Sequence, residues 1–130
     1  MSHKPRMINC PGQGCNEQFK IYGGLLIHLE YGSCVSGLGH LDINKSAASV
    51  YQWKKFIDKA YRQEFLRMED DYLSSNDQPF KCPECDKTFP KLSSLIQHVE
   101  SPSCEQGVLD WPIRNLLRWI YKKHQGWSPI

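Results

Sequence analysis

The chain has 130 residues, of which 16 are Lys or Arg, 14 are Asp or Glu, 40% are hydrophobic and 12% are aromatic. This composition is too apolar for a disordered tail and too polar for a membrane protein, and the length favours one compact domain or two small modules. No run of about 18 apolar residues predicts a transmembrane helix, and no apolar stretch near the start indicates a secretory signal. We therefore expect an intracellular protein that makes no use of a membrane.

Six cysteines in a chain expected to be intracellular indicate metal binding before disulfide bonds. One group of potential ligands has the pattern C-x2-C-x12-H-x5-C and consists of Cys82, Cys85, His98 and Cys104. The other group has the pattern C-x4-C-x12-H-x5-C and consists of Cys10, Cys15, His28 and Cys34. Because the two groups share their second and third gaps, we predict an internal repeat with one metal site in each copy.

The spacing has a mechanical reason, because a tetrahedral zinc ion requires two thiolates on a tight turn and two ligands on a facing helix. The long gap is sufficient for a short hairpin and one side of a helix, so His28 and His98 are expected on helices. Gly12 and Gly14 allow the wider turn of the first copy. The residues expected to form the small core of each copy are Phe19, Leu25, Phe89 and Leu95. The pattern predicts two structural Zn²⁺ ions as cofactors.

At these residues the chain resembles the two-Cys, two-His zinc-finger superfamily, in its variant with Cys as the fourth ligand. The resemblance covers residues 9–34 and 80–105. The first copy, with Cys-Pro-Gly-x-Gly-Cys, then Phe, then His-Leu-Glu-x-Gly-Ser-Cys, is similar to a set of small fungal zinc-finger proteins. The second copy, with Phe-Lys-Cys-Pro-x-Cys and His-Val-Glu-Ser, is similar to the same set. The resemblance implies structural zinc and a ββα unit in each copy.

The sequence around the fingers predicts two further helices. Apolar residues near helical spacing predict one long amphipathic helix over residues 46–72, with Ser46 or Asn44 as its N-cap. Asp110 is expected to cap a second helix. The predicted segments are the first finger at 8–40, the long helix at 44–73, a linker at 74–79, the second finger at 80–106 and a C-terminal helix at 110–125. The predicted fold class is α+β, predominantly helical, with each finger followed by a packing helix.

DNA-reading fingers contact bases through helix positions −1, 3 and 6. In the second finger these positions hold the polar residues Lys91, Ser94 and Gln97. In the first finger they hold Ile21, Gly24 and Ile27. Two isoleucines and a glycine cannot form a hydrogen-bond code, so this finger favours a protein partner. A continuous groove-following array is not expected either, since such fingers are joined by short linkers, whereas the long helix separates these two.

The predicted C-terminal helix carries a basic stripe opposite its apolar face, formed by Arg114, Arg118, Lys122 and Lys123. Such a stripe can contact phosphate groups, but it is also typical of a solvated face with cations near a helix C-terminus. The formal net charge is only +2. Six thiolates and two Zn²⁺ ions bring it close to zero, whereas a chain that depends on phosphate contacts is usually strongly basic.

We therefore hypothesise a zinc-stabilised protein-interaction module in nuclear regulation, with a protein partner and no small-molecule substrate. The alternative is a DNA-binding transcriptional regulator that uses the second finger and the basic C-terminal helix. An enzyme is not expected, because a catalytic zinc ion keeps an open coordination position, whereas each group here supplies four ligands.

Overall fold

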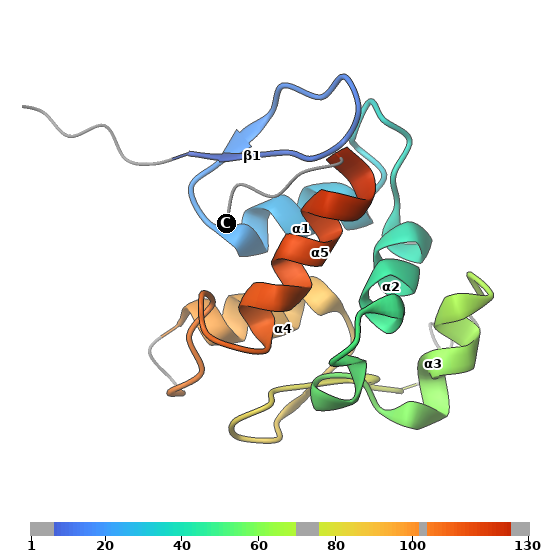
Figure 1. Ribbon diagram of the computed structural model, residues 1–130, viewed down its shortest axis with the longest axis vertical. Coiled ribbons are helices and arrows are strands. Elements are labelled where there is room, and N and C mark those ends of the chain that lie inside the picture. Colours follow the sequence, from blue (N-terminus) through green and yellow to red (C-terminus); the bar gives the residue numbers. More distant parts are fainter. Residues whose placement is uncertain (1–6, 70–75, 102–103, 126–130) are drawn as a thin grey trace, which may run out of the picture.

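The computed structural model describes residues 7–69, 76–101 and 104–125 (Figure 1). Two short antiparallel hairpins are each followed by a helix. The first unit contains β1 (Ile8–Asn9), β2 (Gln18–Phe19) and α1 (Tyr22–Glu30). The second unit contains β3 (Phe80–Lys81), β4 (Thr88–Phe89) and α4 (Leu92–Glu100). The predicted fold class is confirmed: the chain is predominantly helical, with two ββα fingers and a helix after each.

The helices of the two fingers, α1 and α4, pack against each other in antiparallel orientation. At the end of α4, the Glu100 carboxylate accepts hydrogen bonds from the backbone N–H groups of Tyr22 and Gly23, at 2.6 and 2.8 Å. At the end of α1, the Glu30 carboxylate accepts from the N–H of Ser93 at 3.0 Å and from its hydroxyl at 2.5 Å. Each carboxylate therefore satisfies unpaired N–H groups at the positive end of the other helix.

The two helices approach closely where Gly23 of α1 faces Gln97 of α4. A Cβ atom at Gly23 would lie 2.7 Å from Cγ of Gln97, so a larger residue there would push the helices apart. Burial raises the pKa of Glu30, while the hydrogen bonds from Ser93 oppose that shift. Buried apolar residues of both helices belong to one core, including Leu26, Leu29, Ile96 and Val99. The pairing of the finger helices is therefore part of the core of the protein.

The segment between the fingers is not the single long helix that the sequence predicts. It contains α2 (His40–Ser49), a short 3₁₀ helix η1 (Trp53–Lys55) and α3 (Lys59–Leu66), and its residues 70–73 lie outside the described part. The predicted N-caps are also wrong, since α2 begins after Gly39, whose N–H donates to the Asp42 carboxylate at 3.0 Å. Ser46 lies inside α2, and its hydroxyl donates to the Asp42 carbonyl.

The helix is interrupted because the chain pairs with the second finger there. Ile57 forms an antiparallel bridge with Phe80, and the N–H of Lys81 donates to the carbonyl of Phe56 at 2.9 Å. Asp58 then starts α3 as its N-cap, with its carboxylate accepting a backbone N–H. Backbone pairing with a hairpin edge requires an extended chain, so this tertiary contact outweighs the helical periodicity of the segment.

The end of the predicted linker is part of the fold. Of residues 74–79, the structure describes 76–79. Pro79 is buried, and its carbonyl accepts a hydrogen bond from the N–H of Asp58 at 2.9 Å.

The last helix, α5 (Ile113–Gln125), packs on the first finger and on α2. The Tyr121 hydroxyl donates to the carbonyl of Asn9, and the side-chain amide of Gln13 donates to the His124 carbonyl at 3.2 Å. Nε2 of His124 lies 2.9 Å from the hydroxyl of Ser46 in α2. The apolar face of α5 is fully buried and consists of Ile113, Leu116, Leu117 and Ile120.

The packing around the fingers is crosswise. The segment that follows the first finger covers the second, where the Phe65 ring of α3 stacks on Phe80 with ring centroids 5.3 Å apart. The helix that follows the second finger, α5, covers the first (Figure 1). The chain thus crosses between the fingers, with α3 on the second and α5 on the first, while α2 also packs on α1 of the finger that it follows. Within the described ranges, no helix is both long and apolar enough to cross a membrane.

Replacing Glu100 with Ala is expected to lower the free energy of unfolding of the zinc-loaded protein by about 1–2 kcal/mol, because two N–H groups at the start of α1 lose a charged acceptor. Urea unfolding measures this change. Glu17→Ala is the matched control, since Glu17 is an exposed acidic residue of the first finger. Equal stability of the two variants would show that the Glu100 contact contributes nothing.

Candidate metal centres

The first group of predicted ligands comes together between the β1–β2 hairpin and α1. Sγ of Cys10 lies 3.6 Å from Sγ of Cys34, and Sγ of Cys15 lies 3.5 Å from Nε2 of His28. The four ligand atoms all lie within 4.8 Å of one another. The turn between β1 and β2 supplies two cysteines, α1 supplies the histidine, and the last cysteine lies four residues after the end of α1.

The second group has the same arrangement between the β3–β4 hairpin and α4. Sγ of Cys82 lies 3.6 Å from Sγ of Cys104, and Sγ of Cys85 lies 3.2 Å from Nε2 of His98. These four atoms also lie within 4.8 Å of one another. Four of the eight residues are therefore gathered at each finger, as the sequence predicts, and each group has the composition Cys-Cys-His-Cys.

The distances fit a tetrahedral ion and do not fit a disulfide. Zinc bound at about 2.0–2.3 Å places neighbouring ligand atoms of a tetrahedron about 3.3–3.8 Å apart. Three of the closest pairs in the two groups, at 3.5 to 3.6 Å, lie in that range, and the fourth, at 3.2 Å, lies just below it. A disulfide requires about 2.05 Å between its sulfur atoms, and all six cysteines are free thiols. Each group therefore has the size and chemistry to hold one Zn²⁺ ion.

An aromatic ring supports the histidine of each finger. The Phe19 and His28 rings have centroids 5.1 Å apart, and so do those of Phe89 and His98. Leu25 and Leu95, which lie three residues before the two histidines, are buried, so the sequence predicts these two core positions correctly. Such contacts orient the imidazole, which a metal ligand requires.

Backbone and hydroxyl groups surround the sulfur atoms. In the first finger, the N–H of Gly12 points at Sγ of Cys10 at 3.4 Å, and Oγ of Ser36 lies 3.0 Å from Sγ of Cys34. In the second finger, the N–H of Gln106 donates to Sγ of Cys104 at 3.3 Å. Hydrogen bonds of this kind stabilise thiolates in metal sites. These supporting residues do not have a ligand-type side chain, so the sequence pattern did not reveal them.

Gly12 has no acceptable substitute at its position. A Cβ atom there would lie 2.5 Å from Sγ of Cys34 and 2.6 Å from Oγ of Ser36. Any side chain would therefore enter the space in which the sulfur and its hydroxyl partner lie. The wide turn between Cys10 and Cys15 depends on this glycine.

The thiols of the first centre ionise unequally. Burial raises the pKa of Cys10 to about 12. Burial also raises the pKa of Cys34, but hydrogen bonds with Ser36 reverse the shift and lower it to about 6. The two thiols are therefore shifted in opposite directions. Zinc binds thiolates and displaces the protons that the thiols still carry, so metal affinity at this centre rises with pH.

The other predicted binding residues lie away from the two metal groups. On α4 and just before it, Lys91 and Gln97 are exposed and Ser94 is half-buried, and α5 does not cover them. On α5, all four basic residues are exposed: Arg114, Arg118, Lys122 and Lys123. In the first finger, Ile21 is 53% exposed, while Gly24 and Ile27 are half-buried.

Comparison with known proteins supports the zinc assignment in the second finger. Residues 80–101 match the family described as zinc finger, C2H2 type. The match contains Cys82, Cys85 and His98 and ends before Cys104, and it does not include the first finger. No curated protein and no solved structure matches the chain. The family match and the two Cys/His groups together support structural Zn²⁺, and the family match points to a non-catalytic module.

The fourth ligand of the second finger can be tested by two substitutions at Cys104. Cys104→Ala is expected to lower the zinc content from two ions towards one and to unfold the second finger, because three ligands hold zinc far less tightly than four. Cys104→His should keep both ions, since an imidazole restores the fourth ligand. Metal analysis and cobalt absorption spectra measure both results. Two zinc ions bound with unchanged affinity in Cys104→Ala would contradict the assignment.

Proposed function

We propose that the protein is a zinc-stabilised interaction module in which the two fingers form a platform for a protein partner. Each Cys-Cys-His-Cys group holds one structural zinc ion in this proposal. The antiparallel pairing of α1 with α4 is the observation that supports it most strongly. Because each finger helix packs against the other, the pairing stabilises the fold and leaves only the outer surface of each helix accessible to a partner.

This pairing disfavours the reading of duplex DNA by the finger helices. The major groove is about 12 Å wide, which admits one helix of about 10–12 Å diameter with its side chains. Two packed helices have axes about 8–10 Å apart and are together too wide for the groove. Gln97, a base-reading position of the second finger, also lies against Gly23 of the other helix. Lys91 is exposed, so it can still contact a phosphate group of DNA although the paired helices cannot enter the groove.

The outer side of α1 carries an apolar strip that favours a protein partner. Ile21, Gly24, Ile27 and Tyr31 follow one another at intervals of three or four residues, which places them on one face of the helix. Ile21 is 53% exposed and Tyr31 is 70% exposed, and the two residues between them are half-buried. None of these residues is buried beneath the segment between the fingers. A partner helix or loop that covers this strip removes apolar surface from water.

A role in nuclear regulation, with the protein in the nucleus, is part of the proposal. Its support is the zinc-finger family match of the second finger. A DNA-binding regulator that uses Arg114, Arg118, Lys122 and Lys123 is the second candidate, and the exposure of these four side chains on α5 favours it.

The double substitution Ile21→Glu and Ile27→Glu is expected to abolish capture of specific protein partners, because two carboxylates cannot be buried in an apolar interface. Affinity capture with the zinc-loaded protein measures the effect. Leu109→Glu is the control, since Leu109 is 54% exposed and lies outside the strip. Zinc content and thermal unfolding establish that each variant is folded.

Partners that bind the double variant and the wild-type protein equally would contradict the role of the strip. Tight binding of a duplex DNA that is lost in the Lys91→Ala and Gln97→Ala variants would overturn the platform model, since such binding would require the finger helix to reach base edges.

A further inference from the structure

Three shallow hollows form a continuous groove beside η1 and α5. The middle hollow has a volume of about 580 Å³ and shares Val50 with a hollow of about 180 Å³ against α5. It shares Trp53 and Lys54 with a hollow of about 370 Å³ that reaches the β3–β4 hairpin. Because neighbouring hollows have wall residues in common, the three form one path across the surface. We call this path the basic-aromatic groove.

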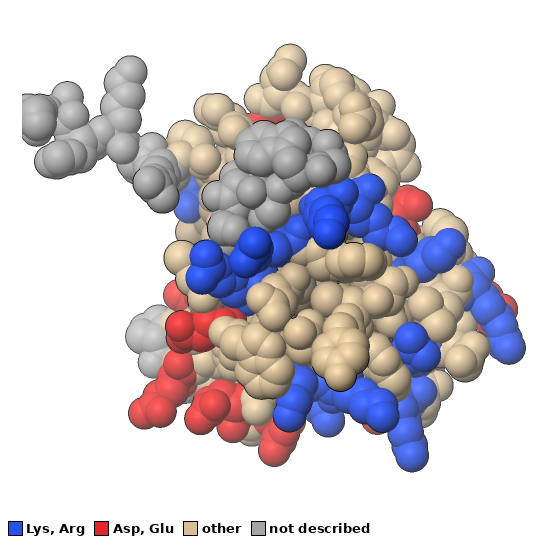
Figure 2. All heavy atoms as spheres, in the orientation of Figure 1, with Lys and Arg blue, Asp and Glu red and all other residues tan. Residues whose placement is uncertain are grey.

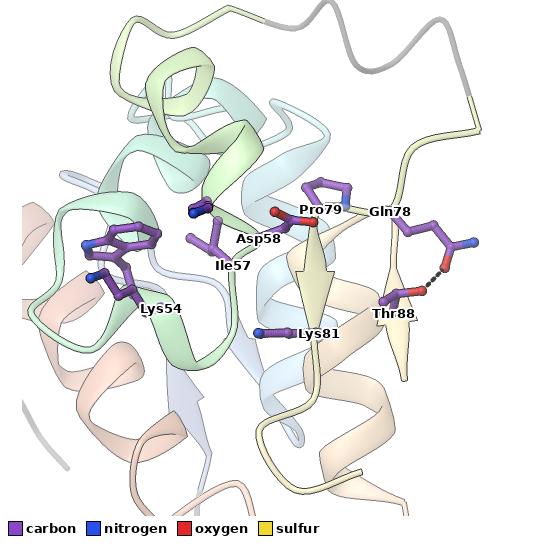
Figure 3. A pocket seen from close by; sticks show the side chains of 9 residues that line it. Lys54, Ile57, Asp58, Gln78, Pro79, Lys81 and Thr88 are labelled. Carbon is purple, nitrogen blue, oxygen red and sulfur yellow. Dashed lines mark hydrogen bonds between the residues drawn. The ribbon is translucent and has the colours of Figure 1, made fainter. Parts of the chain in front are cut away.

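The groove is lined by cations from four separate elements, which are η1, α3, β3 and α5. The basic residues along it are Lys54, Lys55, Lys59, Arg62, Lys81, Arg118 and Lys122. Asp58 is the one carboxylate among the described residues that line it, and its oxygen already accepts the N–H of Ala60 at 3.0 Å. In Figure 3, Lys81 extends from its strand into the hollow, and Lys54 lies across from it. The groove is therefore strongly positive although the whole chain is nearly neutral.

The charge on the molecule is divided between two regions of one face. Figure 2 shows Lys and Arg side chains in a band from the left across the centre to the right of this face and along its lower edge, whereas most Asp and Glu side chains gather at its lower left. Uncharged side chains fill the middle of the face between the basic groups. A polyanion can bind the basic part without meeting the acidic cluster. A net charge of +2 therefore does not argue against phosphate binding here.

Aromatic rings stand between the cations. Tyr51 is 92% exposed and Trp111 is 56% exposed, although large aromatic side chains are normally at least half-buried. Trp53 holds two of the cations, with the Arg62 guanidinium 4.5 Å and the Lys54 ammonium 5.7 Å from its ring. The Lys55 ammonium lies 5.5 Å from the Trp111 ring. Cations are thus positioned by the same aromatic residues that line the groove.

We propose that the basic-aromatic groove binds single-stranded nucleic acid, with the phosphates on its Lys and Arg side chains and bases stacked on Tyr51 and Trp111. A positive groove interleaved with exposed aromatic rings is the arrangement that binds single strands, because unpaired bases offer their faces for stacking. A duplex hides those faces, so it can use only the cations. The groove is also too open and shallow to enclose a small molecule.

This inference goes beyond the proposed protein-binding function, and it concerns a different surface. The groove shares no residue with the strip formed by Ile21, Gly24, Ile27 and Tyr31, although it includes Arg118 and Lys122 of the basic stripe on α5. The protein then has two independent binding surfaces, and the failure of one proposal leaves the other untouched. The double variant Ile21→Glu and Ile27→Glu should bind single-stranded oligonucleotides as the wild type does.

The direct test measures, by fluorescence anisotropy, the binding of the whole zinc-loaded chain to labelled oligothymidine and oligouridine. A duplex of the same length and a polyglutamate peptide are the competing ligands. The single strands are expected to bind more tightly than either. The logarithm of their association constant should fall linearly with the logarithm of salt concentration, with a slope of about −0.7 per neutralised phosphate.

Two pairs of matched variants locate the site. Tyr51→Ala is expected to weaken oligothymidine binding by about 5- to 150-fold through the loss of one stacked base, whereas Tyr31→Ala, an exposed tyrosine outside the groove, should have no effect. Lys55→Glu should weaken binding strongly and reduce the salt slope, whereas Lys20→Glu makes the same change in net charge in the first finger and should change affinity little. Zinc content and thermal unfolding are measured for all four.

Three results would overturn the proposal. Equal affinities of the wild type and Tyr51→Ala for oligothymidine would show that no base stacks on Tyr51. Equal effects of Lys55→Glu and Lys20→Glu would show that binding follows net charge alone. Tighter binding of the duplex or of polyglutamate would assign the groove to another class of partner.

Discussion

The tetrahedral arrangement of two thiolates, an imidazole and a third thiolate is the constraint on which the rest of this structure depends. Each hairpin has strands of only two residues, and such a hairpin cannot be stable in water by itself. The ligand groups tie each hairpin to the helix that follows it. Phe19 and Phe89 then add a small apolar contact beside the histidine. Metal binding therefore contributes most of the free energy that orders each finger.

The two fingers do not remain separate modules. Glu30 and Glu100 lie two residues after the ligand histidines, and each caps the start of the other finger's helix. Parts of the segments that follow the fingers then cross over, so that Phe65 packs on the second finger and Tyr121 on the first. Loss of one zinc ion should therefore affect packing around both fingers, since the same core residues serve them. This coupling distinguishes the fold from fingers joined by flexible linkers.

The same packing decides which surfaces can bind partners. Pairing of α1 with α4 removes the finger helices from the geometry required for groove reading, and it leaves an apolar strip on α1 and a basic-aromatic groove beside η1 and α5. The groove exists because α2 ends at Ser49 and the chain turns through Tyr51 and Trp53 before α3 begins. A continuous helix would have distributed these aromatic residues around its circumference. The break in the helix thus creates the surface for which we propose nucleic-acid binding.

The local chemistry of the protein was determined by the sequence alone. Ligand identity and spacing predict the two metal groups, because a tetrahedral site admits few arrangements of cysteine and histidine on a hairpin and a helix. The apolar face of α5 was equally readable, since Ile113, Leu116, Leu117 and Ile120 recur at helical spacing. Both features depend on residues that are close in the chain, where geometry follows directly from sequence separation.

The long-range arrangement was decided by the tertiary structure. The periodicity of residues 46–72 indicates a helix, but the edge of the β3–β4 hairpin offers unpaired backbone groups to Phe56 and Ile57, and satisfying those groups requires an extended chain. Glu30 and Glu100 each cap the helix of the other finger, but in the sequence they share only their position two residues after a ligand histidine. Their meaning depends on the antiparallel approach of two helices some seventy residues apart, which local patterns cannot specify. Helical periodicity reports which face is apolar, whereas the partner of that face is chosen by the packing of the whole chain.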